Sequence, residues 1–167
     1  MQRFAQAQRV TVNTLVQCAW GLLLKAYTGQ STIVFGSTVA GRPTGLVEVE
    51  TMLGLFINTL PIVLSPMPGQ TVSSWLTAVQ TQNLQLREFE HTPLYAIQQW
   101  AGCAGANLFD TLLVFENYPV STALQQAQAQ LSINSLQQRD ATNYPLTLDI
   151  TLSSSLDIGF DYQKRPI

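Results

Sequence analysis

A helical apolar repeat and a β-branched segment follow each other in this chain with only two residues between them. Residues 11–28, TVNTLVQCAWGLLLKAYT, place apolar side chains at helical spacing on most sides, which predicts a largely buried helix capped by Thr11 or Asn13. Residues 31–40, STIVFGSTVA, are short and rich in β-branched side chains, which is typical of a strand. The chain is therefore expected to open with a helix-to-strand unit.

The rest of the chain continues this mixture of helical and strand patterns. We expect strands at 57–65, 110–119, 146–152 and 156–162, a weaker strand at 129–136, a long amphipathic helix at 71–90, and a short helix after Thr92-Pro93. Pro61 places its strand near an edge or at a bulge of the sheet. The apolar run at 110–119 is typical of a strand buried on both faces, and the alternation in LTLDITL and LDIGFDY predicts a hairpin. This order predicts one α/β domain with a mixed β-sheet and helices packed on one face.

The composition excludes several classes of protein. Only 11% of the 167 residues are charged, 46% are hydrophobic, and the formal net charge is −2. A surface with so few charges is either covered in part by another molecule or domain, or it simply exposes many uncharged glutamine side chains. Both alternatives stay open. Without a basic cluster, electrostatic binding of nucleic acid is not expected. No apolar run reaches the roughly 18 residues that span a bilayer, and the N-terminus lacks a signal-peptide core, so we expect a cytoplasmic protein.

The chain offers no self-contained catalytic set. His91 is the only histidine, and its place in a connector favours a merely polar role. Cys18 and Cys103, the only cysteines, are far apart in sequence, so no metal site is predicted, and Cys18 is expected to be a buried, unreactive thiol. The long segment 41–62, GRPTGLVEVETMLGLFINTLPI, is an elaborate loop that contains no nucleophile, metal-ligand set or phosphate loop.

Five segments nevertheless carry a resemblance when they are taken together and in order. They are TLVQCAWGLLLKAYTGQSTIVFGSTVAGRP, VETMLGLFINTLPI, LREFEHTPLYAIQQWAG, LFDTLLVFENYP and TNYPLTLDI. The chain resembles the C-terminal half of the condensation domain of nonribosomal peptide synthetases from about Val10 to Tyr162. The resemblance implies one lobe of a chloramphenicol acetyltransferase-like fold, in which two lobes form a V around a tunnel.

The resemblance also implies which residues matter. The family's catalytic motif HHxxxDG belongs to the N-terminal lobe and is absent here, so we expect residues 1–167 to be a C-terminal lobe that lacks the catalytic lobe and the final helix and is inactive alone. Gly41, Arg42, Gly54, Asn58 and Thr59 match the family's Gly-Arg and Gly-x-Phe-x-Asn-Thr motifs, near the lobe junction and the substrate tunnel. Arg42 is expected to pair with a carboxylate and Asn58 to place its amide in the channel, or both to hold the loop together.

The implied reaction is amide-bond formation between aminoacyl or peptidyl thioesters carried on phosphopantetheine arms. No cofactor would be bound directly by this chain. Its partners would be the N-terminal lobe, the upstream and downstream peptidyl carrier proteins and an adjacent adenylation domain. The combination of HTPL, VFENYP and TNYPLTL looks like that of a subset of the family found in bacterial siderophore and lipopeptide assembly lines. Two alternatives stay open: a non-catalytic docking or scaffold module for carrier proteins, and the C-terminal lobe of an epimerization domain, which shares this fold.

Overall fold

The computed structural model describes residues 1–42, 48–49, 51–103, 105–116, 142–152 and 155–163. Its helices are α1 (Gln2–Gln8), α2 (Val12–Thr28), α3 (Val72–Leu86), the 3₁₀ turn η1 (Arg87–Phe89) and α4 (Leu94–Trp100). Its strands are β1 (Ile33–Val39), β2 (Asn58–Leu64), β3 (Thr111–Glu116), β4 (Leu146–Leu152) and β5 (Leu156–Tyr162). The predicted helix at 11–28, the strands at 31–40 and 57–65, and the hairpin at 146–162 are confirmed, with ends that agree to within two residues.

Some predicted elements differ from the observed ones. The helix predicted at 71–90 ends at Leu86 and tightens into η1, which turns Phe89 away from the apolar stripe and leaves it 56% exposed. Helix α1 was not predicted, because its single buried side chain, Ala5, gives no apolar period to read. The last residues of the predicted 110–119 strand and the whole of 129–136 lie outside the described residues. Within the described residues, no helix is long and apolar enough to cross a membrane.

The strands form one mixed sheet in the order β2-β1-β3-β4-β5. The inner pairs β1–β3 and β3–β4 are parallel, and the outer pairs β1–β2 and β4–β5 are antiparallel. Strand β2 lies at an edge, as Pro61 predicted, because a proline has no amide to donate to a second neighbour. Gln82 of α3 covers part of this edge by donating from Nε2 to the carbonyl of Val63 at 3.1 Å.

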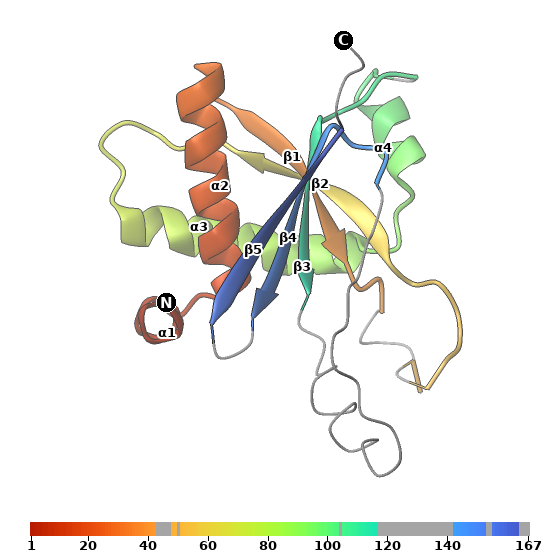
Figure 1. The fold of residues 1–167 in the computed structure, drawn as a ribbon, viewed down its shortest axis with the longest axis horizontal. Helices are drawn as coiled ribbons and strands as arrows, with labels where there is room; N and C mark the ends of the chain where they lie inside the picture. The colour runs from red at the N-terminus through yellow and green to blue at the C-terminus, as the bar shows by residue number, and fades with distance from the viewer. Residues whose placement is uncertain (43–47, 50, 104, 117–141, 153–154, 164–167) are drawn as a thin grey trace.

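The core lies between one face of the sheet and the helices α2 and α3 (Figure 1). Trp20 of α2 and Trp75 of α3 pack into a cluster whose centre is formed by Phe35, Leu113 and Ile150, each 0% exposed. These three side chains come from β1, β3 and β4, so the middle of the sheet lies at the centre of the core. The predicted arrangement of a mixed sheet with helices on one face is thus confirmed.

A buried polar seam joins α2 to α3 beside this core. Gln80 accepts at Oε1 from the Thr14 hydroxyl at 2.9 Å, and the Nδ2 of Asn83 donates to Oε1 of Gln17 at 2.7 Å. The Nε2 of Gln17 in turn donates to the Ser37 hydroxyl of β1 at 3.4 Å. Gln17 is 2% exposed, so these contacts satisfy polar groups that would otherwise be buried without partners.

The opposite face of the sheet carries an aromatic cover. The Phe109 ring stacks on Tyr144 with centroids 5.2 Å apart, and a Cβ added at Gly36 of β1 would lie 2.3 Å from Cε2 of Phe109. Phe109 is 5% exposed, so it has little room to move aside. Glycine at position 36 is therefore what lets the ring lie directly on the strand.

Replacing Gly36 with alanine is expected to lower the free energy of unfolding by about 1–3 kcal/mol, because the new methyl group would overlap the Phe109 ring. Urea denaturation followed by tryptophan fluorescence measures this. Gly159→Ala in β5 is the matched control, since its Cβ would meet its nearest atom at an ordinary 3.6 Å. Equal stability of the two variants would contradict the close contact.

Cys18 of α2 lies in the core at 3% exposure, as predicted, and burial raises the pKa of its thiol from 9.0 to about 12. We expect a thiol reagent at pH 8 to modify the partly exposed Cys103 in the native protein, and Cys18 only after unfolding.

Above pH 9 the Cys18 thiol loses its proton in the unfolded chain but keeps it in the folded chain. The contribution of Cys18 to the free energy of unfolding therefore falls as the pH rises toward 12. The loss should be absent in Cys18→Ala, and rapid native labelling of Cys18 would refute the burial.

Candidate functional site

The loop that follows β1 leaves the strand at Gly41 along a path that only glycine allows. Gly41 has φ +63°, and a Cβ there would lie 1.8 Å from the carbonyl oxygen of Phe56. The Gly41 amide donates to Oε2 of Glu90 at 3.1 Å, which ties the start of the loop to the residue after η1. Position 41, matched from the sequence, is thus a point where two distant segments meet.

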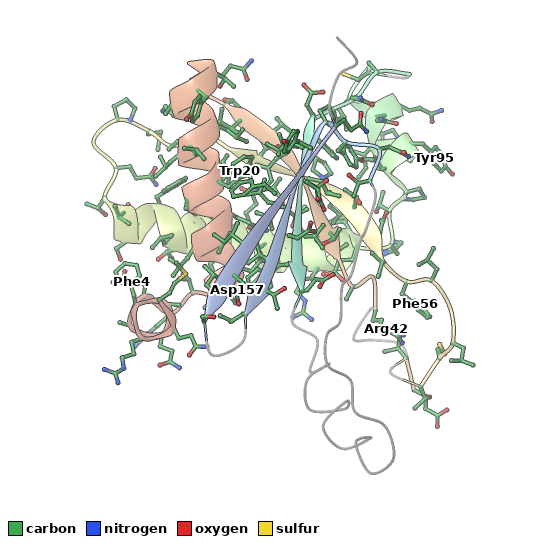
Figure 2. All side chains as sticks on the ribbon, in the orientation of Figure 1. Phe4, Trp20, Arg42, Phe56, Tyr95 and Asp157 are labelled. Carbon is green, nitrogen blue, oxygen red and sulfur yellow. The ribbon has the colours of Figure 1, made fainter. Side chains whose placement is uncertain are left out.

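The Arg42 guanidinium holds the returning part of the loop. Its Nη1 donates to the carbonyl of Val49, and its Nη2 donates to the carbonyl of Met52 at 3.4 Å. The guanidinium carbon also lies 4.4 Å from the centre of the Phe56 ring, a cation–π contact (Figure 2). In place of the carboxylate expected for Arg42, the described contacts are two carbonyls and a ring, which suit the planar fork of an arginine.

Asn58, the first residue of β2, joins that strand to the connector between η1 and α4. Its Nδ2 donates to the carbonyl of Glu90 at 2.8 Å and to the carbonyl of Thr92 at 2.7 Å. Two carbonyl acceptors fix which end of the amide carries the nitrogen. Both donors of the side chain are therefore engaged within the chain. Pro93 occupies the N-cap position of α4, and Thr92 before it is buried at 9% exposure.

The other two matched residues lie along the same segment. A Cβ at Gly54 would lie 3.3 Å from the Phe56 ring, and Thr59 pairs with Thr38 in the β1–β2 ladder. The structure therefore brings Gly41, Arg42 and Gly54 together around Phe56. It links Gly41 and Asn58 through Glu90.

Sequence reasoning missed the two residues that make these connections. Phe56 lies inside the matched Gly-x-Phe-x-Asn-Thr pattern, so its position was available as a signal. Glu90 gave no signal, because it lies 32 residues after Asn58 and the contact uses its backbone as well as its carboxylate.

The outer part of this loop exposes large apolar side chains. Leu53 is 101% exposed, Leu55 is 89% exposed and Ile57 is 53% exposed. Single exposed apolar residues are common, but three at alternating positions on one anchored loop form an apolar surface that is typical of an interaction site.

A cavity of about 280 Å³ opens beside this loop, between the ends of β1 and β3. We call it the β1–β3 slot, and its walls include Val39, Ala40, Ile57, Val114, Phe115 and Glu116. Five of these six side chains are apolar. Ile57 lines the slot and is also the third exposed apolar residue of the loop, so loop and slot form one continuous region of the molecule.

The described residues provide positioning groups rather than a reactive set. Among them, no three His, Cys, Asp or Glu side chains gather as a metal site would require. His91 is exposed on the turn between η1 and α4, and the Cys18 thiol has its pKa raised by burial. The arrangement can hold a loop and line a cavity; a nucleophile paired with a base is not found in this region.

Asn58→Asp is expected to destabilise the protein more than Asn58→Ala. Alanine removes both hydrogen bonds and costs about 1–3 kcal/mol of unfolding free energy. Aspartate adds repulsion between its carboxylate and two carbonyl oxygens, and the gap between the variants should narrow at low pH, where a protonated Asp regains one donor. Chemical denaturation at several pH values checks this, with the exposed Asn107→Asp as the control. An Asn58→Asp protein as stable as the wild type would refute the assigned contacts.

Comparison with known proteins places this geometry in a family. A model of the condensation domain matches residues 1–165. A linear gramicidin synthase of Brevibacillus parabrevis is 45% identical over 165 residues, which are 98% of this chain and 3% of that protein.

Two solved structures have the same fold. One is the first condensation domain of the calcium-dependent antibiotic synthetase in complex with a substrate analogue (TM-score 0.71, 16% identity, 96% of this chain and 35% of that one). The other is holo-AB3403, a four-domain nonribosomal peptide synthetase bound to AMP and glycine (TM-score 0.75, 18% identity, 95% of this chain and 13% of that one). The chain therefore spans about a third of the solved condensation domain and a few per cent of the curated relative. On these grounds, the chain belongs to the condensation-domain family of nonribosomal peptide synthetases.

Proposed function

We propose that this chain is the C-terminal lobe of a condensation domain that forms an amide bond between aminoacyl or peptidyl groups held as thioesters on carrier proteins. The observation that carries the proposal is the match of the condensation-domain model to residues 1–165, while the chain covers 35% of a solved condensation domain with the same fold. In this proposal the reactive histidines of HHxxxDG stand on the N-terminal lobe. The lobe described here supplies a wall of the tunnel.

The anchored loop is the proposed lobe junction. Gly41, Arg42, Gly54, Asn58 and Thr59 give the loop its path, and their partners in the described structure are Phe56 and Glu90. The exposed Leu53 and Leu55 would pack against the N-terminal lobe, because fully exposed leucines at the tip of a held loop gain most from being covered. The hydrogen bonds of Arg42 and Asn58 then act by positioning, which is the second of the two roles expected for them.

An apolar strip on β5 supports a further part of the proposal. Ile158, Phe160 and Tyr162 are 48%, 57% and 65% exposed, although they lie on the same face of the sheet as the buried Leu148 and Ile150. A final helix packed beside α2 would cover this strip. In the intact protein the substrates would arrive on phosphopantetheine arms of an upstream and a downstream carrier protein, next to an adenylation domain, in the cytoplasm. Membership of the synthetase family supports these partners.

The full-length protein that contains this chain is expected to form a peptide product when it is given one carrier loaded with a donor residue and another loaded with an acceptor. Leu53→Ser combined with Leu55→Ser should lower the turnover at least severalfold, because it weakens the packing of the loop tip while leaving the core of the lobe untouched. Mass spectrometry of the carrier-bound product measures the rate, and circular dichroism checks the fold.

The matched control is Met67→Ser combined with Val72→Ser. These side chains are 66% and 63% exposed, Met67 in the turn before α3 and Val72 as the first residue of α3, and their loss should leave the rate unchanged. Carrier proteins that bind without any product would instead favour a docking or scaffold module. Exchange of the α-hydrogen of the donor with solvent, without amide formation, would favour an epimerization domain.

A further inference from the structure

Glu90 holds both ends of the loop that runs from Gly41 to Asn58. Its carboxylate oxygen Oε2 accepts from the Gly41 amide at 3.1 Å, and its backbone carbonyl accepts from Nδ2 of Asn58 at 2.8 Å. Gly41 lies just after the end of β1, and Asn58 is the first residue of β2. One residue therefore binds the loop where it leaves the sheet and where it returns.

Glu90 is itself held by elements that belong to the core. It directly follows η1, and its amide donates to the carbonyl of Arg87 at 3.5 Å. Helix α3, which leads into η1, is fixed against α2 by the contact of Asn83 with Gln17. The loop is thus attached through Glu90 to the well-packed part of the lobe.

The carboxylate is the part of Glu90 that a substitution can test. Gly41 is buried, and the Glu90 carboxylate is the acceptor that the described residues give to its amide. A buried amide without an acceptor is unfavourable, and a charged acceptor forms a stronger hydrogen bond than a neutral one. Position 41 cannot serve for this test, because a Cβ there would lie 1.8 Å from the carbonyl oxygen of Phe56.

Contacts within the loop connect its held end to its apolar outer part. The Arg42 guanidinium, next to Gly41, donates to carbonyls of the returning chain and lies 4.4 Å from the centre of the Phe56 ring. The exposed Leu53 and Leu55 come just before Phe56 in the sequence. A shift of the chain at Gly41 would therefore also shift these leucines, which form the proposed lobe junction.

A cavity of about 210 Å³ has Glu90 in its wall. All of its wall residues are among those that the structure describes, and two of them, Thr11 and Arg87, are exposed, so the cavity is open to solvent. Arg87 also brings a guanidinium to the cavity, which favours a small carboxylate there. Removal of the Glu90 side chain would thus leave a site that an added carboxylate can reach.

We propose that Glu90 is a positioning residue for amide-bond formation, because its carboxylate fixes the loop at Gly41 and thereby places the wall of the tunnel at the lobe junction. This inference rests on the proposed function, since the position of the loop affects turnover only if the lobe closes a condensation tunnel. It goes further in assigning a role in the reaction to a residue outside the matched positions, and to one group of that residue.

The test measures peptide formation by the full-length protein and its variants at position 90. Glu90→Ala should lower kcat about tenfold or more, because reacting groups that are slightly misplaced react much more slowly. Glu90→Gln should lose much less, since its amide oxygen can still accept from the Gly41 amide. Formate should restore part of the rate of Glu90→Ala by supplying the missing carboxylate, while sodium chloride at the same concentration should not.

Amide hydrogen exchange gives a readout that does not depend on turnover. The segment that contains Gly41 should exchange faster in Glu90→Ala than in the wild type, and formate should slow this exchange again. Glu88→Ala, the same change at an exposed glutamate of η1, should alter neither turnover nor exchange. If circular dichroism shows that Glu90→Ala does not fold, Glu90→Asp takes its place, because its carboxylate stops one methylene short of the Gly41 amide and the same loss of kcat is expected.

A wild-type kcat in Glu90→Ala, or in the Asp variant that replaces it, would overturn the inference. An equal loss in Glu90→Ala and Glu90→Gln that formate does not restore would also overturn it, since Glu90 would then only support the fold. In both cases the wild-type product would leave the proposed function standing. Absence of product in the wild type would count against the proposed function itself, and a positioning role in that reaction would fall with it.

Discussion

The apolar contact between the helices and the middle of the sheet determines what the rest of the molecule can do. Phe35, Leu113 and Ile150 come from the three central strands and are fully buried under α2 and α3. Apolar burial is the main favourable contribution to the free energy of folding, so these contacts hold the three central strands in place. On β5, the side chains of Ile158, Phe160 and Tyr162 are 48%, 57% and 65% exposed, so the molecule has a well-packed centre and an apolar flank.

Function in this lobe depends on polar contacts that add little burial. A glycine, a guanidinium and a carboxamide set the path of the loop after β1. The Gly41 amide donates to the Glu90 carboxylate, while the Arg42 and Asn58 side chains donate to backbone carbonyls. Contacts to backbone carbonyls depend on the course of the chain and tolerate changes in neighbouring side chains. Such a loop can present different outward side chains while keeping one shape, which suits a wall whose specificity lies in the residues that face the tunnel.

The sequence predicted most of the fold because its elements have strong local patterns. The buried helix at Val12–Thr28 and the alternating strands at 146–162 read clearly from apolar spacing. Helix α1 escaped because Ala5 alone faces the core, and the end of α3 escaped because a 3₁₀ turn carries no separate signal. The candidate site was predictable only as a set of positions, because the contacts of Gly41 and Asn58 with Glu90 join segments far apart in the chain. Glu90 meets the amide of Gly41 from 49 residues away. Strands β1 and β3 share only the pairs Gly36 with Leu112 and Ser37 with Leu113, and this short pairing was not predicted from the sequence.

The polar seam between α2 and α3 has a mechanical consequence. Apolar helix faces can slide or rotate on each other at small cost, but carboxamides that each need a given partner allow only one alignment. Thr14 and Gln17 of α2 grip Gln80 and Asn83 in the second half of α3, just ahead of the turn that carries Glu90. These hydrogen bonds therefore fix the position and rotation of α3 relative to α2 near the end of α3 that leads to Glu90 and the loop.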